Sequence, residues 1–549
     1  MKNLKIKILV IILAILVIFG IYYVTLPAIN IHSVNTWWFM IIAVFVISIL
    51  FSLRKNFNDK RKIKDFLSKS EKIDHKSLGV TGLTKFGFAV TGILLIIYII
   101  GSILSSPIVN AKKYQQLMTV TDKDFIENIE QADFNSVPIL DKDSASLLGN
   151  REMGSMVDMV SQFEVADDYS QINVNNRPVR VTPLAYASTI KWLTNQKDGI
   201  PAYMQIDMAT QDTKCVKLTE TIKYSKSEYF NRNIYRHLRF KFPTYIFDNQ
   251  IFFEIDDEGV PYWICPVKQF NIGLFGGQTI GKVVICNAVT GDCTVYDIDD
   301  VPQWVDKVYQ AELLIELYNY SGTLKHGYFN SILGQKDCLQ ATSGYNYIAM
   351  DDDVWVYSGV TSVSGDQSNV GFILMNQRTM ETHFYKIEGA TEESAMSSAQ
   401  GQVQHLGYRS TFPLLLNISN EPTYFMALKD EAGLVKQYAM VNIQKYQWVA
   451  TGDTVNECKK NYNDLLSKNG LSASSDQSSN DISGTIENIM SVIVDGNTHI
   501  YFTIKNKTEI FDIDMTNSSF IDIVKYKEGD SIKFSYIGGD NPVSVTEIK

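Results

Sequence analysis

Thr391-Glu-Glu-Ser-Ala-Met-Ser-Ser-Ala-Gln-Gly-Gln-Val-Gln-His-Leu406 opens the clearest folding unit of the chain, residues 390–450. Thr391 suits a helix N-cap, and the two glutamates after it lie in the first turn, where the helix dipole favours anions. Apolar residues then recur at helical spacing, at Ala395, Ala399, Val403 and Leu406. Three strands are predicted to follow, at Thr411–Ile418, Thr423–Leu428 and Leu434–Val449. One helix across an antiparallel meander predicts a compact α+β layer pair.

A short motif occurs three times in the middle of the chain, in the form Asp/Asn-x-x-Thr-x-Asp/Glu-Thr/Cys. Its copies begin at Asp207, Asn287 and Asn376, which are 80 and 89 residues apart, and apolar strand residues flank each copy. Asp or Asn opening a tight turn, with Thr at the return, is typical of a hairpin. Three unrelated hairpins remain an alternative, but the near-constant spacing favours a true repeat. We therefore expect residues 181–466 to form repeated α+β modules.

The helix quoted above resembles the opening helix of a PepSY domain, which is Ser/Thr-capped and has the form Glu-x-Ala. The segments Phe253–Trp263 and Val284–Gly291 also resemble PepSY strands, which close on an Asp-x-x-Thr-Gly turn; here Asn287 replaces the Asp. The insert Lys268–Lys282 between these strands departs from the family pattern. The resemblance implies a bacterial cell-envelope protein with PepSY-like modules that bind or restrain other proteins. It brings no catalytic residues.

The parts around the modules have a different composition. Residues 108–180 are predicted to be a polar helical connector, and residues 467–483, rich in Ser, Asn and Asp, a linker. The last segment, 484–549, alternates apolar and polar residues between turns. Six strands are predicted there, near 488–494, 498–504, 508–513, 519–524, 531–537 and 543–548. So many short strands predict a small closed barrel, with an OB-like barrel as one form.

Residues 1–107 are predicted to be a membrane anchor of three transmembrane helices. Three apolar runs without a charged residue occur at Ile8–Leu26, Trp37–Leu53 and Phe86–Leu104, with 19, 17 and 19 residues. A helix needs about 17 to 25 residues to cross the hydrocarbon core. Buried soluble helices are the alternative, as is a cleaved signal peptide for the first run, although that run is longer than a signal h-region of about 7–15 residues.

The loops between these runs predict the orientation. Residues 54–85 carry ten Lys and Arg residues, whereas residues 27–36 carry none. The positive-inside rule places the N-terminus and the loop 54–85 in the cytoplasm, where the loop can touch anionic lipid headgroups. Residues 108–549 then lie outside the cytoplasm. An aromatic group at the outer interface agrees with this orientation: Tyr22, Tyr23, Trp37 and Trp38.

Charge and composition exclude several classes of function. Hydrophobic residues make up 45% of the chain, which argues against disorder. The net charge is −10, made of +9 over residues 1–107 and −19 over the rest, so the large C-terminal part lacks the basic surface of a nucleic-acid binder. The apolar runs contain no ionisable residue, which argues against a channel or transporter. The stretch Gly276–Val283 has Val where a P-loop needs Ser or Thr, so no nucleotide is expected.

No catalytic, metal-binding or cofactor-binding motif is found, and no cofactor is expected. Acidic clusters such as Asp351–Asp353 lack EF-hand spacing and read as strand-end turns, with calcium left open. Cys286 and Cys293 flank the second repeat turn and are a possible disulfide, because opposed strand positions bring Cα atoms within bonding range; free thiols are the alternative. The predicted helix 227–241 carries a basic stripe, a possible contact for an anionic ligand such as wall polymer or lipid headgroups, or a solvated face, at Arg232, Arg236 and Arg239.

Three functions fit these observations. The first is a multi-pass bacterial envelope protein whose extracytoplasmic region binds a protein or cell-wall partner as a scaffold or regulator. The second is a wall-modifying hydrolase that uses an unrecognised pair of carboxyls, which would have to converge in one cleft. The third is a sensory or assembly subunit of a membrane complex. Membrane lipid is an expected partner; nucleic acid and nucleotide are not.

Overall fold

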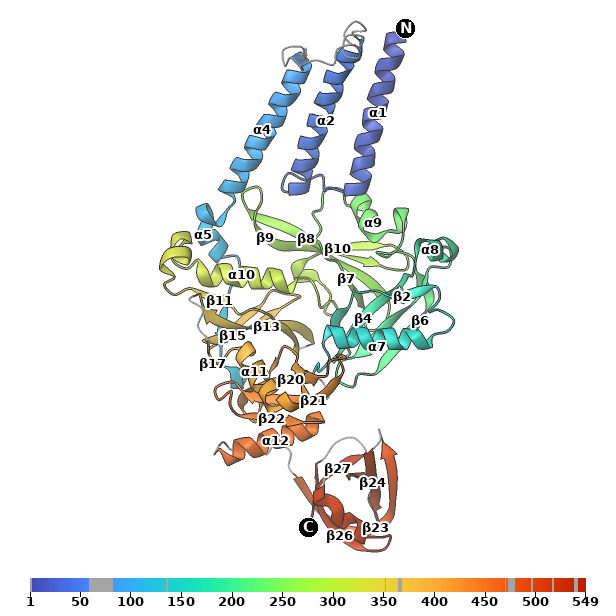
Figure 1. Cartoon of the computed structure of the whole chain (residues 1–549), viewed down its shortest axis with the longest axis vertical. Coiled ribbons are helices and arrows are strands. Elements are labelled where there is room, and N and C mark those ends of the chain that lie inside the picture. The colour runs from blue at the N-terminus through green and yellow to red at the C-terminus, as the bar shows by residue number, and fades with distance from the viewer. Residues whose placement is uncertain are drawn as a thin grey trace. The chain divides into compact units, whose positions relative to one another are not determined.

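The computed structural model describes residues 2–58, 82–134, 137–350, 352–363, 368–469, 471, 479–494, 497–515, 518–537 and 542–549. The chain divides into two compact units, Met1–Leu465 and Leu466–Lys549. The chain is α+β, with several sheets after an N-terminal region of apolar helices (Figure 1). The predicted α+β class and apolar N-terminal helices are therefore confirmed.

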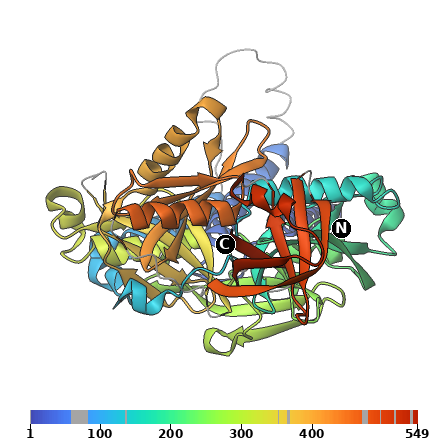
Figure 2. The same ribbon diagram turned by 90° about the horizontal axis from the view of Figure 1, so that it is seen from below.

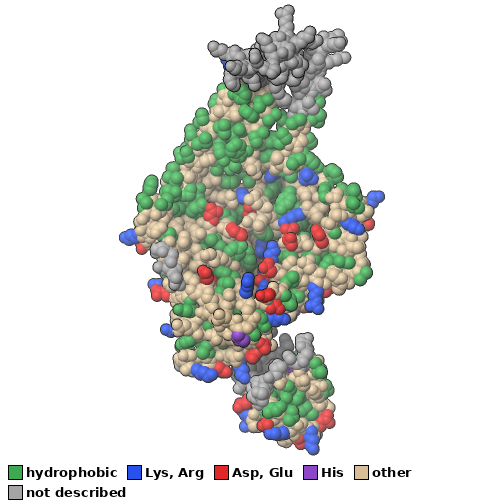
Figure 3. Space-filling view, viewed as in Figure 1, with side chains coloured by type: hydrophobic (Ala, Val, Ile, Leu, Met, Phe, Trp, Pro, Cys, Tyr) green, Lys and Arg blue, Asp and Glu red, His purple; other side chains and the backbone are tan. Residues whose placement is uncertain are grey.

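Three helices open the described part of the first unit: α1 (Lys2–Thr25), α2 (Val34–Asn58) and α4 (Gly82–Leu104). Within α4, Thr84–Leu104 is long and apolar enough to cross a membrane, while the apolar parts of the other two helices are shorter, Ile15–Thr25 and Val34–Ile49. Hydrophobic side chains cover this part of the surface (Figure 3). Such large exposed apolar faces need an apolar environment. Of the predicted loop 54–85, residues 59–81 lie outside the described residues.

The predicted helical connector, 108–180, is only partly helical. Its helices are α5 (Pro107–Gln115), α6 (Phe125–Asn128) and α7 (Lys142–Ser155), and its strands are β1 (Thr121–Lys123), β2 (Phe163–Val165) and β3 (Ser170–Val174). The strands join sheets built mainly from later residues: β1 pairs in parallel with β16, and β2 and β3 pair with β4. The polar sequence of β1 misled the prediction, because its partner β16 is distant in sequence, whereas β3 forms a tight hairpin with β4 through Asn175 and Asn176.

Four sheets follow one another along the chain, and their strands pair antiparallel except for β1 with β16. The first contains β2 and β3 with β4 (Arg177–Tyr186), β5 (Ile200–Asp207) and β6 (Thr213–Ile222). The second contains β7 (Phe252–Ile255), β8 (Pro261–Ile272), β9 (Gly276–Asn287) and β10 (Cys293–Asp297). The third contains β1, β11 (Leu339–Ala341), β12 (Asn346–Met350), β13 (Asp353–Ser362), β15 (Gly371–Asn376) and β16 (Thr382–Tyr385). The fourth contains β18 (Arg409–Ser410), β19 (Leu414–Ile418), β20 (Glu421–Lys429), β21 (Val435–Asn442) and β22 (Val449–Gly452).

Helices and a small ribbon connect these sheets. The helices are α8 (Thr189–Asn195), α9 (Ile234–Lys241), α10 (Ala311–Thr323), α11 (Glu392–Gln402) and α12 (Val455–Lys468), and the ribbon pairs β14 (Ser368–Asn369) with β17 (Gly389–Ala390). The predicted helix 227–241 is shorter than expected. Asn233 caps α9, and a single 3₁₀ turn, Phe230–Arg232, precedes it. The Asn side chain accepts a hydrogen bond from the N–H of Arg236, which starts the helix there.

The three copies of the turn motif join β5 to β6, β9 to β10 and β15 to β16. In each copy, the first side chain accepts hydrogen bonds through Oδ1 from the backbone N–H groups two and three residues later. The backbone N–H of that first residue donates to the carbonyl five residues later, and the fifth residue of the motif has a positive φ. The predicted hairpins are therefore confirmed, with one shared turn geometry.

A fourth turn of related design joins β21 to β22. Asn442 opens it, its Oδ1 accepts from the N–H of Lys445, and its own N–H donates to the carbonyl of Trp448. The motif search missed this copy because the turn is one residue longer and has no Thr at the fourth position. Each of the four sheets therefore contains a hairpin whose turn begins with Asp or Asn.

The predicted unit 390–450 is confirmed in its main features. Thr391 caps α11 by accepting from the N–H of Ser394, and Ala395 and Ala399 are buried against the fourth sheet. In Figure 2 the orange segments of α11, the fourth sheet and α12 lie together. Tyr462 of α12 hydrogen-bonds Thr423 of β20 with its hydroxyl, at 2.9 Å.

Three buried apolar clusters link the sheets in chain order. The first packs residues of sheet one against β7 and β8, the second packs β9 and α10 against the third sheet, and the third packs the third sheet against α11 and the fourth. Trp263 is the largest fully buried side chain of the first cluster. Burying both faces of the third sheet explains the apolar runs Val354–Tyr357 in β13 and Phe372–Met375 in β15.

The described residues of the second unit form five strands, whereas the sequence predicted six. They are β23 (Ser479–Val494), β24 (Asn497–Ile504), β25 (Ile510–Asp514), β26 (Ser531–Ile537) and β27 (Val543–Ile548). They pair in the order β23-β24-β25-β27-β26, and β26 pairs back with β23. The predicted strand 519–524 is instead a 3₁₀ helix, Ser518–Lys525, with Phe520 and Ile523 in the core. The OB-like form stays a prediction.

β23 also begins inside the predicted linker 467–483. Residues Ser479–Thr485 pair with β26, so backbone hydrogen bonds order a stretch that has little apolar content. α12 reaches into the start of the same segment and ends at Lys468. The remainder of the predicted linker lies almost entirely outside the described residues. The turn at 495–496 also lies outside them.

Candidate functional site

The tip of the β8–β9 hairpin packs against the ends of the N-terminal helices that lie next to the sheets. Ser105, just after α4, accepts hydrogen bonds through Oγ from the N–H groups of Leu274 and Phe275, at 2.9 and 3.1 Å. The Leu274 carbonyl lies 2.9 Å from His32 Nδ1 in the α1–α2 connection. The Phe275 ring lies 6.1 Å from Trp37 and 5.3 Å from Tyr98, between α2 and α4. We call this contact the hairpin clamp.

Close backbone approach makes the hairpin clamp possible. Gly273 has φ 61°, and a Cβ there would lie 2.5 Å from Ser105 Oγ. A Cβ on Gly276 would lie 2.0 Å from the Ser105 carbonyl. These glycines therefore serve close packing against the helix end, whereas the sequence indicated only a glycine-rich hairpin loop.

The predicted basic stripe lies at a second contact with the helices. Arg239 is buried, and its guanidinium donates to the carbonyls of Leu26 and Tyr245, at 2.9 and 2.6 Å. Burial lowers the pKa of this guanidinium. Arg236 stacks on the ring of Tyr23 at 4.3 Å, and Arg232 donates to the carbonyl of Gln196.

The three arginines therefore differ in role. Arg239 ties α9 to the end of α1 through neutral carbonyls, so it packs into the protein. Arg236 lines a cavity of about 480 Å³ together with Lys226 and the buried Glu228, and its Nε is buried without a partner in the described structure. The anionic-ligand role expected for the stripe stays a prediction for Arg232 and Arg236.

A segment after the second sheet, Asp306–Tyr309, joins three sheets through buried hydrogen bonds. Glu254 of β7 accepts from the N–H groups of Asp306 and Lys307, at 3.0 and 2.9 Å. Asp306 accepts from the N–H of Asn173 on β3, at 2.6 Å. The N–H groups of residues 308 and 309 donate to the carbonyl of Gln377, which follows β15. We call this region the central junction.

The central junction holds charges away from water. Glu254, Asp306 and Lys307 are each at most 6% exposed. Burial raises the pKa of Glu254 to about 7 and raises that of Asp306 well above its usual range, with the charge of Glu254 as the second cause. Burial, helped by the charge of Arg180, lowers the pKa of Lys307 to about 8. Perturbed groups of this kind gather at functional sites, although ion-pair networks perturb them too.

An ion pair closes one side of the junction. Arg378 donates from Nε and Nη2 to the two oxygens of Asp353, at 2.7 and 2.8 Å. Asn376 adds a hydrogen bond to the same carboxylate at 2.8 Å. Asp352, from the same acidic cluster, accepts from the Asn173 side chain at 3.1 Å. Asp351 lies outside the described residues. Asp352 and Asp353 are therefore both hydrogen-bonded to other side chains of the protein.

Arg180 of β4 is the most unusual charge near the junction. It is 6% exposed, and its Nη2 donates to Gln171 Oε1 at 3.1 Å. Its Nε and the Gln171 Nε2 are buried without hydrogen-bond partners within the described structure. Burial lowers the pKa of this guanidinium. Sequence reasoning passed over it, although a charge within the strand sequence Val179-Arg180-Val181 was a signal that could have drawn attention.

Arg180 lines a pocket of about 210 Å³ between the first, third and fourth sheets. Aromatic rings form part of the wall, from Tyr345, Tyr347, Phe412 and Phe425. Asp141 also lines the pocket, and its carboxylate pairs with Lys429. Lys307 Nζ lies 4.6 Å from the centre of the Tyr347 ring and adds positive charge behind that wall.

Cys286 and Cys293 form a disulfide across the second repeat turn, as the sequence suggested. They face each other in register on β9 and β10. His237 lies beside the bridge, and its Nε2 is 2.7 Å from the Gly291 carbonyl. The bridge therefore staples a hairpin that packs against α9.

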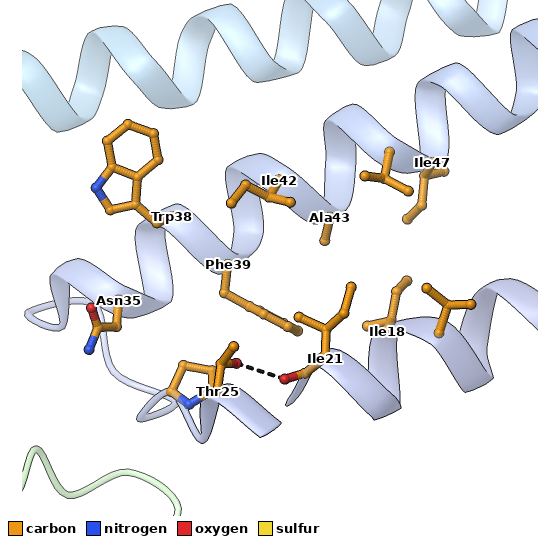
Figure 4. A pocket seen from close by; sticks show the side chains of 12 residues that line it. Ile18, Ile21, Thr25, Asn35, Trp38, Phe39, Ile42, Ala43 and Ile47 are labelled. Carbon is orange, nitrogen blue, oxygen red and sulfur yellow. Dashed lines mark hydrogen bonds between the residues drawn. The ribbon is translucent and has the colours of Figure 1, made fainter. Parts of the chain in front are cut away.

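An apolar groove of about 400 Å³ runs between α1 and α2 (Figure 4). Ile18, Ile21, Phe39 and Ile42 are among its lining residues. The hydroxyl of Thr25, at the end of the groove, donates a hydrogen bond to the Ile21 carbonyl of the same helix, at 2.8 Å (Figure 4). No charged side chain lines this groove, whereas Arg180 lines the pocket described above.

No protein-family model matches the chain, and no curated protein sequence matches it. Among solved structures, the GH32 beta-fructofuranosidase BmSUC1 of Bombyx mori is similar, with 8% identity, 73% of this chain and 69% of that chain covered, and a TM-score of 0.17. A mutant of that enzyme in complex with sucrose gives 9% identity, 72% and 69% coverage, and a TM-score of 0.18. Both TM-scores are too low for the likeness to carry an argument. What this chain does must therefore be inferred from its own residues.

Proposed function

We propose that this chain is a multi-pass membrane protein of the cell envelope whose large extracytoplasmic region binds a protein or cell-wall partner as a scaffold or regulator. The hairpin clamp is the observation that supports it most. It holds the β8–β9 hairpin against the helix ends through Ser105, His32 and Phe275. A region held to its anchor in this way presents its surface to a partner at a fixed height and orientation.

The contacts of the helix ends also support the proposed topology. Leu26, after α1, accepts a hydrogen bond from Arg239 of α9. Trp37 near the start of α2 and Ser105 after α4 contact the tip of the β8–β9 hairpin. These ends belong on the side of residues 108–549, and the basic loop 54–85 belongs on the opposite, cytoplasmic side.

A reporter enzyme that is active only in the cytoplasm is expected to work when fused after Lys76 and to fail when fused after Lys549. The cause is the contrast of ten Lys and Arg residues in 54–85 against none in 27–36. A reporter active only outside the cytoplasm should give the opposite pair of results. Activity of the cytoplasmic reporter after Lys549 would contradict the topology and the proposal with it.

Binding is tested with the full chain in detergent and insoluble cell-wall polymer, and with crosslinking in intact cells. Co-sedimentation with the polymer, or a protein crosslinked only to residues 108–549, supports a binding role. Release of soluble wall fragments would instead support the hydrolase. That reaction needs two carboxyls in one cleft, and the buried carboxyls of Glu254 and Asp306 line none of the pockets described above. If the chain binds no partner and releases no wall fragments, the binding proposal and the hydrolase proposal are both contradicted.

The hairpin clamp also favours a second function, that of a sensory or assembly subunit in which the outer sheets act on the helices. Replacing Ser105 by Ala leaves the N–H groups of Leu274 and Phe275 without their acceptor. An unsatisfied donor costs about 1–3 kcal/mol, so we expect hydrogen exchange at these two amides to rise roughly 5- to 100-fold.

Ser102→Ala is the matched control for this substitution. Its hydroxyl donates to the Tyr98 carbonyl within the same helix, so hairpin exchange should stay unchanged. Mass-spectrometric hydrogen exchange on the full chain measures both variants. Equal exchange in the Ser105→Ala and Ser102→Ala proteins would show that the hairpin clamp does not couple the two regions.

A further inference from the structure

We propose that the pocket at Arg180 binds a small organic carboxylate, with the guanidinium of Arg180 as the anion-binding group. The pocket combines a buried cation, unpartnered donors and aromatic walls, and it is separate from the hairpin clamp.

The charge of Arg180 is unusual because no carboxylate pairs with it in the described part of the chain. Its guanidinium donates to the neutral Gln171 side chain, and its Nε makes no hydrogen bond within the described residues. Burying an unpaired cation is expensive, and the cost is recovered when an anion completes the pair. The neighbouring carboxylate of Asp141 is already held by Lys429 and by the N–H of Ser144.

The surroundings favour a single negative charge over a double one. Lys307, behind the Tyr347 ring, adds to the positive potential. The carboxylate of Asp141 at the wall opposes it, which disfavours a phosphate dianion. A planar carboxylate matches the fork of a guanidinium through two parallel hydrogen bonds.

The size and walls of the pocket limit the rest of the ligand. A volume of about 210 Å³ is below the range of about 300–1,000 Å³ typical of drug-sized ligands, so the ligand is small. The rings of Tyr345, Tyr347 and Phe412 suit an apolar or aromatic body beside the carboxylate.

The test uses the full chain in detergent, with acetate, benzoate, benzamide and inorganic phosphate as probes in calorimetric titrations. Benzoate should bind more tightly than acetate, because its ring fills the aromatic part of the pocket. Benzamide, a neutral analogue of the same shape, should bind at least 10-fold more weakly than benzoate. If phosphate binds more tightly than benzoate, the carboxylate assignment is wrong. If neither acetate nor benzoate binds, the pocket is not a ligand site.

Arg180→Met should weaken benzoate binding about 10- to 100-fold, because it removes charge-assisted hydrogen bonds. Arg180→Lys keeps the charge but loses the fork, so it should lie between Arg180→Met and the wild type. Arg177→Met is the control: Arg177 is on the same strand but exposed, and its loss should leave binding unchanged.

Thermal unfolding without ligand provides an independent readout. Because Arg180 is a buried cation without a paired carboxylate, Arg180→Met should unfold at a temperature no lower than that of the wild type. If Arg180→Met is clearly less stable while Arg180→Lys binds benzoate like the wild type, Arg180 has a structural role and the proposal is wrong.

Discussion

Replacing Asp353 by Ala is expected to lower the free energy of unfolding by about 3–5 kcal/mol, the cost of breaking a buried ion pair from one side. The carboxylate is 7% exposed, and it accepts two hydrogen bonds from Arg378, which is 16% exposed, and one from Asn376. Removing it leaves a guanidinium with little access to water. Chemical unfolding of the full chain, followed by intrinsic fluorescence, measures the change.

Asp212→Ala is the matched control for this change. Asp212 occupies the sixth position of the first motif copy and pairs with Lys214 on the surface, where the two side chains are 56% and 69% exposed. Its loss should cost no more than about 1 kcal/mol. The double change Asp353→Met with Arg378→Met should recover much of the stability, since paired apolar residues can replace a buried ion pair. An Asp353→Ala protein as stable as Asp212→Ala would contradict the prediction.

Glu254 is expected to make the protein less stable as pH rises from about 4.5 to about 7. Burial raises its pKa to about 7 in the folded state, against 4.5 for an ordinary glutamate. Between these values the folded protein holds a proton that the unfolded chain has lost, so each step up in pH favours unfolding. At about 1.4 kcal/mol per pH unit, the loss is on the order of 3 kcal/mol across the window.

Glu254→Gln separates this effect from the titration of other groups. Its amide does not ionise, so the difference in stability between variant and wild type should change with pH in this window and be constant above about 7. The amide also loses one acceptor for the N–H groups of Asp306 and Lys307, which gives an offset of about 1–3 kcal/mol at every pH. A pH-independent difference would mean that Glu254 does not carry the raised pKa. Thermal unfolding at pH 5 and above measures it.

Local signals predicted the local structure well. Thr391 and the helix after it, the three hairpins and the pairing of Cys286 with Cys293 all depend on residues close in sequence. Asp or Asn side chains bond to their own turn, and a cap bonds to its own helix, so no distant partner is needed. The same reasoning failed at 519–524, which was predicted to be a strand and forms a 3₁₀ helix. The strands on either side, β25 and β26, both pair with β27, so the sheet needs no strand from this segment.

The candidate site could not be predicted in the same way, because its members come from distant parts of the chain. Arg180 lies on β4, Glu254 on β7, and Asp306 and Lys307 on a loop. Each alone reads as a surface charge. Burial and pairing made them unusual, and both depend on how the sheets stack.

The sequence by itself determined the apolar N-terminal helices, the α+β class and the repeated Asp- or Asn-initiated turns, because composition and short-range hydrogen bonding decide these features. The tertiary structure decided that β1, β2 and β3 join sheets made of later residues, and that Arg239 ties α9 to the end of α1. It also decided that Arg180 faces a pocket without a paired carboxylate. The physical reason is that the cost of burying a charge depends on which groups surround it, and those groups are brought together only when the sheets pack.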